Sequence, residues 1–221
     1  MFLVFVTITI LVEDPVAPGF GYNEFQMGLV AVPSSLGMLA FAPLWGRWVA
    51  AKGPKPVMLA GFSVMGLGAL GLAIFHSSIV ELMVFVVPTM VGNVAVLIAM
   101  SNIIVLTVSP KELGIQTGMN QTFRNLGSAV GPVLGAVVIA SYARTIMTPN
   151  GTLHPPTITG FVVLFALVAA VALVGLVLSL GLRNYRFHAD GTRSDAARPR
   201  GAPAAPTMDP ASAPVAVDPS S

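Results

Sequence analysis

The chain has 221 residues, of which 55% are hydrophobic and only 9% are charged, and its formal net charge is +2. A soluble domain carries about 25% charged residues, so this chain has too little polar surface to fold in water. It contains no cysteine, which excludes disulfides and thiolate chemistry. The composition predicts an all-α polytopic membrane protein.

Six apolar segments follow one another along the chain. The first, residues 1–12, would rise only about 18 Å against roughly 30 Å of hydrocarbon, so we interpret it as a truncated helix. It also lacks the basic stretch that begins a cleavable signal peptide. The six together form a predicted half-bundle over residues 1–186. The expected helices lie near 1–12, 23–45, 57–75, 79–107, 111–142 and 158–182.

Three of these helices begin with a capping box, in which a polar side chain precedes Glu or Gln by three residues. The pairs are Asn23 with Gln26, Ser78 with Glu81, and Ser109 with Glu112. Capping and compensation of the helix dipole therefore explain the carboxylates at Glu24, Glu81 and Glu112 without invoking chemistry.

Basic residues between the segments fall mostly on one side. Only Arg144 is on the other side. The positive-inside rule makes the basic side cytoplasmic and places the C-terminus there. Residues 187–221 are rich in Ala, Pro, Ser and Asp without periodicity, which predicts a disordered cytoplasmic tail. The residues on the basic side are Arg47, Lys52, Lys55, Lys111, Arg183 and Arg186, joined by Arg193, Arg198 and Arg200 of the tail.

Polar residues distinguish interior helices from outer ones. The segments 57–75 and 158–182 hold no amide or charge deep within them, so we expect them to face lipid. The segments 79–107 and 111–142 are expected to be interior, since they carry most of the intramembrane amides and one arginine. Their candidates for a substrate cavity are Asn93, Gln116, Asn120 and Arg124. Interhelical hydrogen bonding is the alternative for each amide, and we prefer it for Gln121 and Asn125.

A stripe on the segment 111–142 combines Arg124 with small residues. At 100° per residue, Gln116, Asn120 and Arg124 share an arc of about 100° with three glycines. Such glycines allow close helix approach, which is typical of a gating helix or of static packing. A buried arginine either lines a cavity or pairs with a carboxylate or helix C-terminus elsewhere, and both interpretations stay open. The residues of the predicted gating motif are Gly127, Gly131, Pro132 and Gly135.

The sequence shows no pattern typical of an enzyme. It has no Ser/His/Asp set, phosphate-binding loop or paired carboxylates, and its three histidines are far apart without metal-ligand spacing. We therefore expect no catalytic residue, no metal and no cofactor.

Three stretches of the sequence resemble motifs of a known family. The run from Gly127 to Ala136 resembles the antiporter motif GxxxGPxxGG of drug:proton antiporters in the major facilitator superfamily, with Ala136 in place of the last glycine. The stretch 118–127 is similar to the eleventh helix of the twelve-helix core in fourteen-span drug exporters. A decayed copy of the loop motif GxLaDrxGrk, with Ala50 in place of its Asp, contains Gly46, Arg47, Lys52, Gly53 and Lys55.

This resemblance implies the C-terminal half of a transporter in which two six-helix halves rock about a central site. It implies proton-coupled export of small amphipathic molecules across the plasma membrane, with the proton gradient as energy source. Because no acidic residue lies deep in a span, we expect the titrating group in the missing N-terminal half, unless Glu13 and Asp14 serve instead. The alternatives are an uptake transporter, a truncated or non-transporting membrane subunit, and a half-size transporter acting as a homodimer. No nucleic acid partner is expected.

Overall fold

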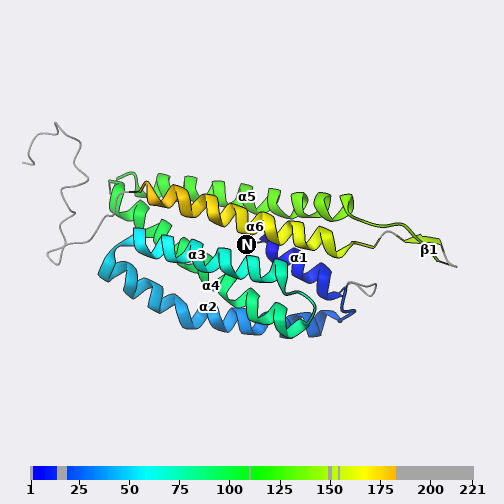
Figure 1. Cartoon of the computed structure of the whole chain (residues 1–221). Coiled ribbons are helices and arrows are strands. Elements are labelled where there is room, and N and C mark those ends of the chain that lie inside the picture. Colours follow the sequence, from blue (N-terminus) through cyan, green and yellow to red (C-terminus); the bar gives the residue numbers. More distant parts are fainter. Residues whose placement is uncertain (1, 14–18, 110, 149–150, 154, 183–221) are drawn as a thin grey trace, which may run out of the picture.

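The computed structural model describes residues 2–13, 19–109, 111–148, 151–153 and 155–182. Their fold is a bundle of helices, five of which are long and apolar enough to cross a membrane, so the predicted fold class is confirmed (Figure 1). The helices are α1 (Phe2–Glu13), α2 (Glu24–Lys52), α3 (Pro54–Ile74), α4 (Ile79–Thr107), α5 (Leu113–Ser141) and α6 (Ile158–Leu180).

The long helices lie alongside one another in alternating directions, and the connections between them lie at the two ends of the bundle (Figure 1). The shorter α1 begins near the middle of the bundle and ends at the same end as the α3–α4 and α5–α6 connections (Figure 1). We call this the hairpin end, because it carries a two-stranded antiparallel hairpin formed by β1 (Ile146–Thr148) and β2 (Gly151–Leu153). The sequence analysis did not predict this hairpin.

Two of the three predicted capping boxes form. At the start of α2 the Asn23 side chain accepts from the Gln26 backbone N–H at 2.9 Å, while Asn23 N–H donates back to the Gln26 side chain at 3.0 Å. At the start of α4 the Ser78 side chain and Glu81 make the same reciprocal arrangement. The third box is absent, because Glu112 is the residue that caps α5 and no side-chain bond is made there. The first helical residue is accordingly Leu113 rather than the predicted 111.

The α2 helix continues seven residues beyond its predicted end at residue 45. It ends at Lys52, and a single residue, Gly53, joins it to α3. Gly53 has φ of 86°, and its N–H donates to Val49 O at 2.8 Å. Because this φ is in the left-handed region, glycine stops the helix at a position that apolar periodicity does not reveal. The α3 helix starts directly at Pro54, three residues before its predicted start.

The tightest packing in the structure joins α3 to α4. A Cβ added to Gly92 would lie 2.5 Å from both Gly61 O and Met65 N, and one added to Gly61 would lie 2.9 Å from Gly92 O. A Cβ added to Gly68 would be similarly close to the backbone of Thr89, and Gly71 lies against the ring of Phe85. These two helices therefore meet almost backbone to backbone, through a seam that we define by Gly61, Gly68, Gly71 and Gly92.

Burial within this chain differs from two predictions that concern a complete bundle. The α3 helix, expected to face lipid, packs against α2, α4 and α6 and buries much of its length. The α5 helix, expected to be interior, has Gly135 as the one buried residue among its described positions. Polar residues indicate which helices line the pathway of a complete transporter. Burial within this chain depends instead on which helices pack together, and α5 has few neighbours here. The predicted domain boundary at residue 186 lies outside the described residues.

Candidate functional site

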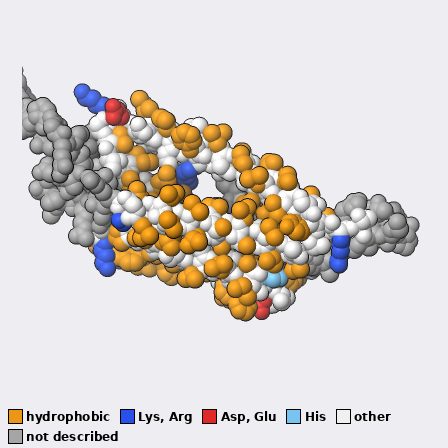
Figure 2. Space-filling view, turned by 45° about the horizontal axis from the view of Figure 1, so that its top comes forward, with side chains coloured by type: hydrophobic (Ala, Val, Ile, Leu, Met, Phe, Trp, Pro, Cys, Tyr) orange, Lys and Arg blue, Asp and Glu red, His pale blue; other side chains and the backbone are white. Residues whose placement is uncertain are grey.

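The polar stripe of α5 and the middle of α4 enclose a pocket of about 240 Å³. Arg124 lines it from α5 and Asn93 from α4, so two of the predicted cavity residues meet in one place. Gly127 and Gly131 form the α5 wall one and two turns further on, and Leu3 of α1 closes the far side. Figure 2 shows a hollow near the middle of an otherwise hydrophobic flank, with a basic side chain beside it.

The guanidinium of Arg124 is held by neutral groups of its own helix. It donates to the Gln121 side-chain oxygen at 3.3 Å, and the Gln121 amide donates in turn to Asn125 at 3.1 Å. None of the residues that line the pocket is acidic. Gln121, Arg124 and Asn125 are thus linked along α5, and all three side chains are exposed within this chain. The interhelical hydrogen bonds expected for Gln121 and Asn125 stay a prediction.

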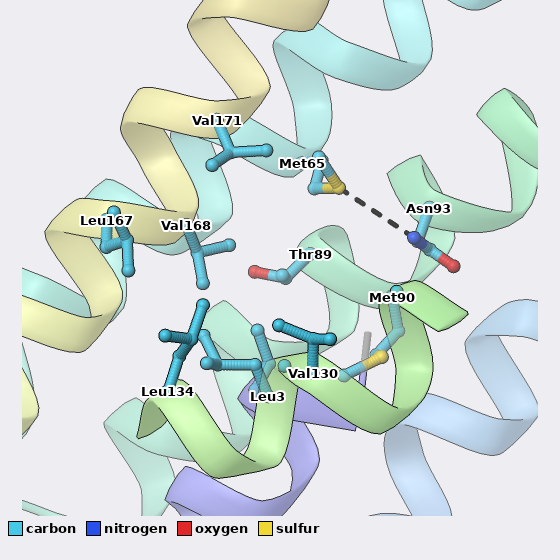
Figure 3. Close-up of a pocket in the computed structure, with 13 residues that line it drawn as sticks. Leu3, Met65, Thr89, Met90, Asn93, Val130, Leu134, Leu167, Val168 and Val171 are labelled. Atoms are coloured by element: carbon cyan, nitrogen blue, oxygen red, sulfur yellow. Dashed lines mark hydrogen bonds between the residues drawn. The ribbon is translucent and has the colours of Figure 1, made fainter. Parts of the chain in front are cut away.

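A larger, mostly apolar chamber of about 400 Å³ adjoins this pocket and shares Leu3, Asn93, Gly127 and Gly131 with it. Figure 3 shows its wall of valine, leucine and methionine side chains, with the Thr89 hydroxyl pointing inward. That hydroxyl already donates to Phe85 O at 2.8 Å. The site therefore joins a charged pocket to a chamber with few polar groups.

Asn93 is the polar residue common to both spaces. Its amide nitrogen lies 4.0 Å from Met65 Sδ, a weak acceptor (Figure 3). Its side-chain oxygen is buried and has no hydrogen-bond partner among the described residues. An unpaired buried acceptor costs about 1–3 kcal/mol. Asn102, nine residues further along α4, instead donates to Ile98 O of its own helix at 2.8 Å.

The other predicted cavity residues do not line these two spaces. Asn120 is half-buried and Gln116 is exposed on α5, towards the end at which that helix begins. The sequence stripe placed them on the same face as Arg124, but they lie one and two turns closer to the start of α5.

The predicted gating motif is open rather than closely packed. A Cβ added to Gly127 would meet nothing within 4 Å, and Gly131 and Gly135 face only Leu3, at 3.7 Å and 3.3 Å. Pro132 lies inside α5 between them and is half-buried. The close helix approach expected at these glycines is thus absent within this chain, because the described helices provide no backbone opposite them.

The predicted loop motif is mostly helical. Gly46, Arg47 and Lys52 belong to the last two turns of α2, and Lys55 lies in the first turn of α3. The Lys55 ammonium donates to Leu180 O at 2.8 Å, where α6 ends. A cation at a helix C-terminus interacts favourably with the helix dipole, so Lys55 links the start of α3 to the end of α6.

Sequence reasoning missed a third pocket, of about 130 Å³, between α1, α2 and α4. Its walls include Phe5, Ser35 and three methionines, Met27, Met38 and Met90. Met27 and Met38 are eleven residues apart, which places them on one face of α2 with Ser34 between them. This spacing is visible in the sequence. It did not predict a pocket, because methionines at helical spacing are also typical of ordinary core packing.

All described carboxylates lie at helix ends. Glu13 is the last residue of α1 and Glu24 the first of α2, and both line a shallow pocket of about 410 Å³ at the hairpin end. Glu81 and Glu112 begin α4 and α5. No group of three or more His, Asp or Glu side chains with metal-binding geometry occurs in the part of the chain that the structure describes.

Comparison with known proteins accounts for this arrangement. The chain is 26% identical over 167 residues to an uncharacterized MFS-type transporter, YcnB, of Bacillus subtilis (strain 168). The match covers 73% of this chain and 34% of that protein, so the chain spans about a third of its relative's length. The sequence profile of the Major Facilitator Superfamily matches residues 1–215. The chain therefore belongs to the major facilitator superfamily and is a multi-pass membrane protein of a transporter family.

Proposed function

We propose that this chain forms the C-terminal half of a secondary-active transporter that exports small amphipathic molecules in exchange for protons. The observation that carries the proposal is the meeting of Arg124 and Asn93, from two different helices, at a pocket continuous with an apolar chamber. A charged group beside an apolar space is the arrangement that an amphipathic molecule requires. This role needs no catalytic residue and no cofactor beyond the proton gradient.

The charge of Arg124 narrows the expected cargo. Because no acidic side chain lines its pocket, the site favours a molecule that offers an anionic or hydrogen-bond-accepting group to the guanidinium. Asn93 lies on the wall that the pocket and the chamber share, so the same molecule would contact it between its charged and apolar parts. The apolar remainder would occupy the chamber of Figure 3.

The exposed face of α5 supports a partner half. Val130, Val133 and Val137 are each more than half exposed along the helix that carries the predicted gating motif. A second six-helix half packed there would cover them and would supply the acidic group for proton coupling, since the carboxylates of the described spans lie only at helix ends. The C-terminus would then be cytoplasmic in the plasma membrane, as the basic residues indicate.

Efflux measurements test this proposal in cells that lack their own exporters. The chain is expressed together with any coding sequence that belongs to the same open reading frame. The cells are loaded either with an anionic fluorescent amphiphile or with cationic ethidium. We expect efflux of the anionic dye to stop with a protonophore and to fall at least about tenfold in Arg124→Ala, as for the loss of a charge-assisted contact. Arg144→Ala, at the hairpin end, is the matched control. Equal efflux from cells that express Arg124→Ala and from cells that express the unsubstituted chain would contradict the proposed site.

Labelling tests the orientation separately. The chain has no cysteine, so Ser77→Cys and Ser109→Cys each introduce a single thiol at opposite ends of α4. A membrane-impermeant maleimide should label position 77 in intact cells and position 109 only after lysis. The reverse pattern would overturn the cytoplasmic assignment of the C-terminus.

A further inference from the structure

The two tryptophans of the chain, Trp45 and Trp48, form a stacked pair near the end of α2. Their ring centroids are 5.5 Å apart and their planes differ by 22°. Trp45 is buried among apolar side chains of α3 and α4, whereas Trp48 is half-buried. The inner ring therefore anchors the pair, and the outer ring presents part of its surface outside the bundle.

A lysine completes this arrangement. The Lys52 ammonium lies 5.4 Å from the centroid of the Trp48 ring, within the range of a cation–π interaction. Lys52 is exposed, as is Arg47 on the turn before it. The end of α2 thus combines an aromatic surface with two accessible positive charges.

Among the residues that the structure describes, basic side chains outnumber carboxylates at this end of the bundle. Residues 25–80 contain no Asp or Glu, and at the position of the acidic residue in the resembled loop motif the chain has Ala50. At the neighbouring α4–α5 connection the carboxylate of Glu112 follows Lys111 directly. Counted over the described residues, the end of α2 therefore carries more positive than negative charge.

The length of α2 places this end in the head-group layer. Its 29 residues rise about 43 Å at 1.5 Å per residue, against roughly 30 Å of hydrocarbon. Trp48 is four residues, or about 6 Å, before the end of the helix. Tryptophan rings favour this interface, and lysine and arginine side chains extend from it towards phosphate groups.

We propose that Arg47, Trp48 and Lys52 form a binding surface for the head group of an anionic phospholipid. The phosphate interacts with the two cations, and the Trp48 ring covers the glycerol and upper acyl region. The surface does not depend on the transported molecule. It gives the decayed loop motif a role in holding the end of α2 at a lipid layer of defined charge.

Tryptophan fluorescence tests the proposal, since both tryptophans lie at this surface. The purified full chain, with Trp45→Phe to leave Trp48 as the sole emitter, is reconstituted into phosphatidylcholine vesicles. A fixed fraction of the lipid is replaced by a brominated lipid that carries its bromine near the head group. This brominated lipid is either phosphatidylglycerol or phosphatidylcholine, and the quenching of Trp48 fluorescence by the two is compared. We expect brominated phosphatidylglycerol to quench several-fold more effectively. Each positive charge near an anionic surface raises the affinity for it by a factor of about five. The double substitution Arg47→Gln and Lys52→Gln should therefore abolish the preference.

Controls separate this surface from general attraction to negative vesicles. Arg144→Gln, at the hairpin end, should keep the full preference for brominated phosphatidylglycerol. Equal quenching by the two brominated lipids, or a preference that survives the double substitution, would overturn the proposal. Release of quenching by soluble glycerol phosphate would also overturn it, because the surface would then bind free phosphate esters. Circular dichroism of each variant verifies that the helices are retained.

Discussion

The glycines of the α3–α4 seam and those of α5 look alike in sequence but differ completely in their surroundings. Along the seam each glycine faces backbone or an aromatic ring of the opposite helix, and no larger residue fits without displacement. On α5 Gly127 faces open space, and Gly131 and Gly135 touch a single leucine. The comparison teaches that small-residue spacing indicates where helices are able to approach, whereas the structure decides where they do.

The largest expected effect breaks the seam itself. Gly92→Ala places a methyl group against Gly61 O and Met65 N, both of which are backbone atoms that no rotamer change moves aside. We expect a loss of about 3 kcal/mol in unfolding free energy, measured by titrating the detergent-solubilised chain with sodium dodecyl sulfate. Gly127→Ala, the matched change on α5, should leave stability unchanged or slightly raised. Equal destabilisation by both changes would mean that the α5 glycines are packed as tightly as the seam.

A smaller effect, of opposite sign, distinguishes the seam from the pocket beside it. Asn93→Leu removes a buried oxygen that has no partner among the described residues, so we expect stability to rise by about 1–2 kcal/mol. The same change should reduce efflux if the oxygen contacts cargo. Asn102→Leu is the control, since Asn102 bonds its own helix and should leave efflux unaffected. Destabilisation by Asn93→Leu would show that the amide serves packing instead.

The smallest effect compares the helix starts of the two regions. Ser78→Ala removes the capping bond of α4, and we expect it to cost about 1 kcal/mol. Ser109→Ala, at the corresponding place before α5, should cost nothing because no side chain caps that helix. Hydrogen exchange at the first turns of α4 and α5 measures both. Loss of protection in α5 upon Ser109→Ala would show that its predicted capping box forms after all.

Local chemistry could be predicted from the sequence wherever neighbouring residues determine it. The membrane class, the long apolar helices and the caps at Asn23 and Ser78 all follow from hydropathy and from side chains within one turn. The pairing of Arg124 with Asn93 on one pocket was less accessible, because helical angles place residues on faces without saying which faces meet.

Features that depend on neighbouring helices were missed or misplaced. The methionine pocket arises only where α1, α2 and α4 converge. The exposure of α5 reflects which helices pack around it within this chain, so its interior position in a complete bundle stays a prediction. The continuation of α2 past residue 45 depends on the backbone angle at Gly53, and composition gives no sign of that angle.

That single connecting residue also constrains how the protein enters the membrane. With only Gly53 between α2 and α3, the end of α2 and the start of α3 lie at the same depth in the bilayer. In the proposed orientation Gly53 stays on the cytoplasmic side throughout insertion, so α2 and α3 must adopt opposite orientations as a pair. A longer linker at this position would release that requirement and would allow α2 alone to be integrated in the wrong orientation.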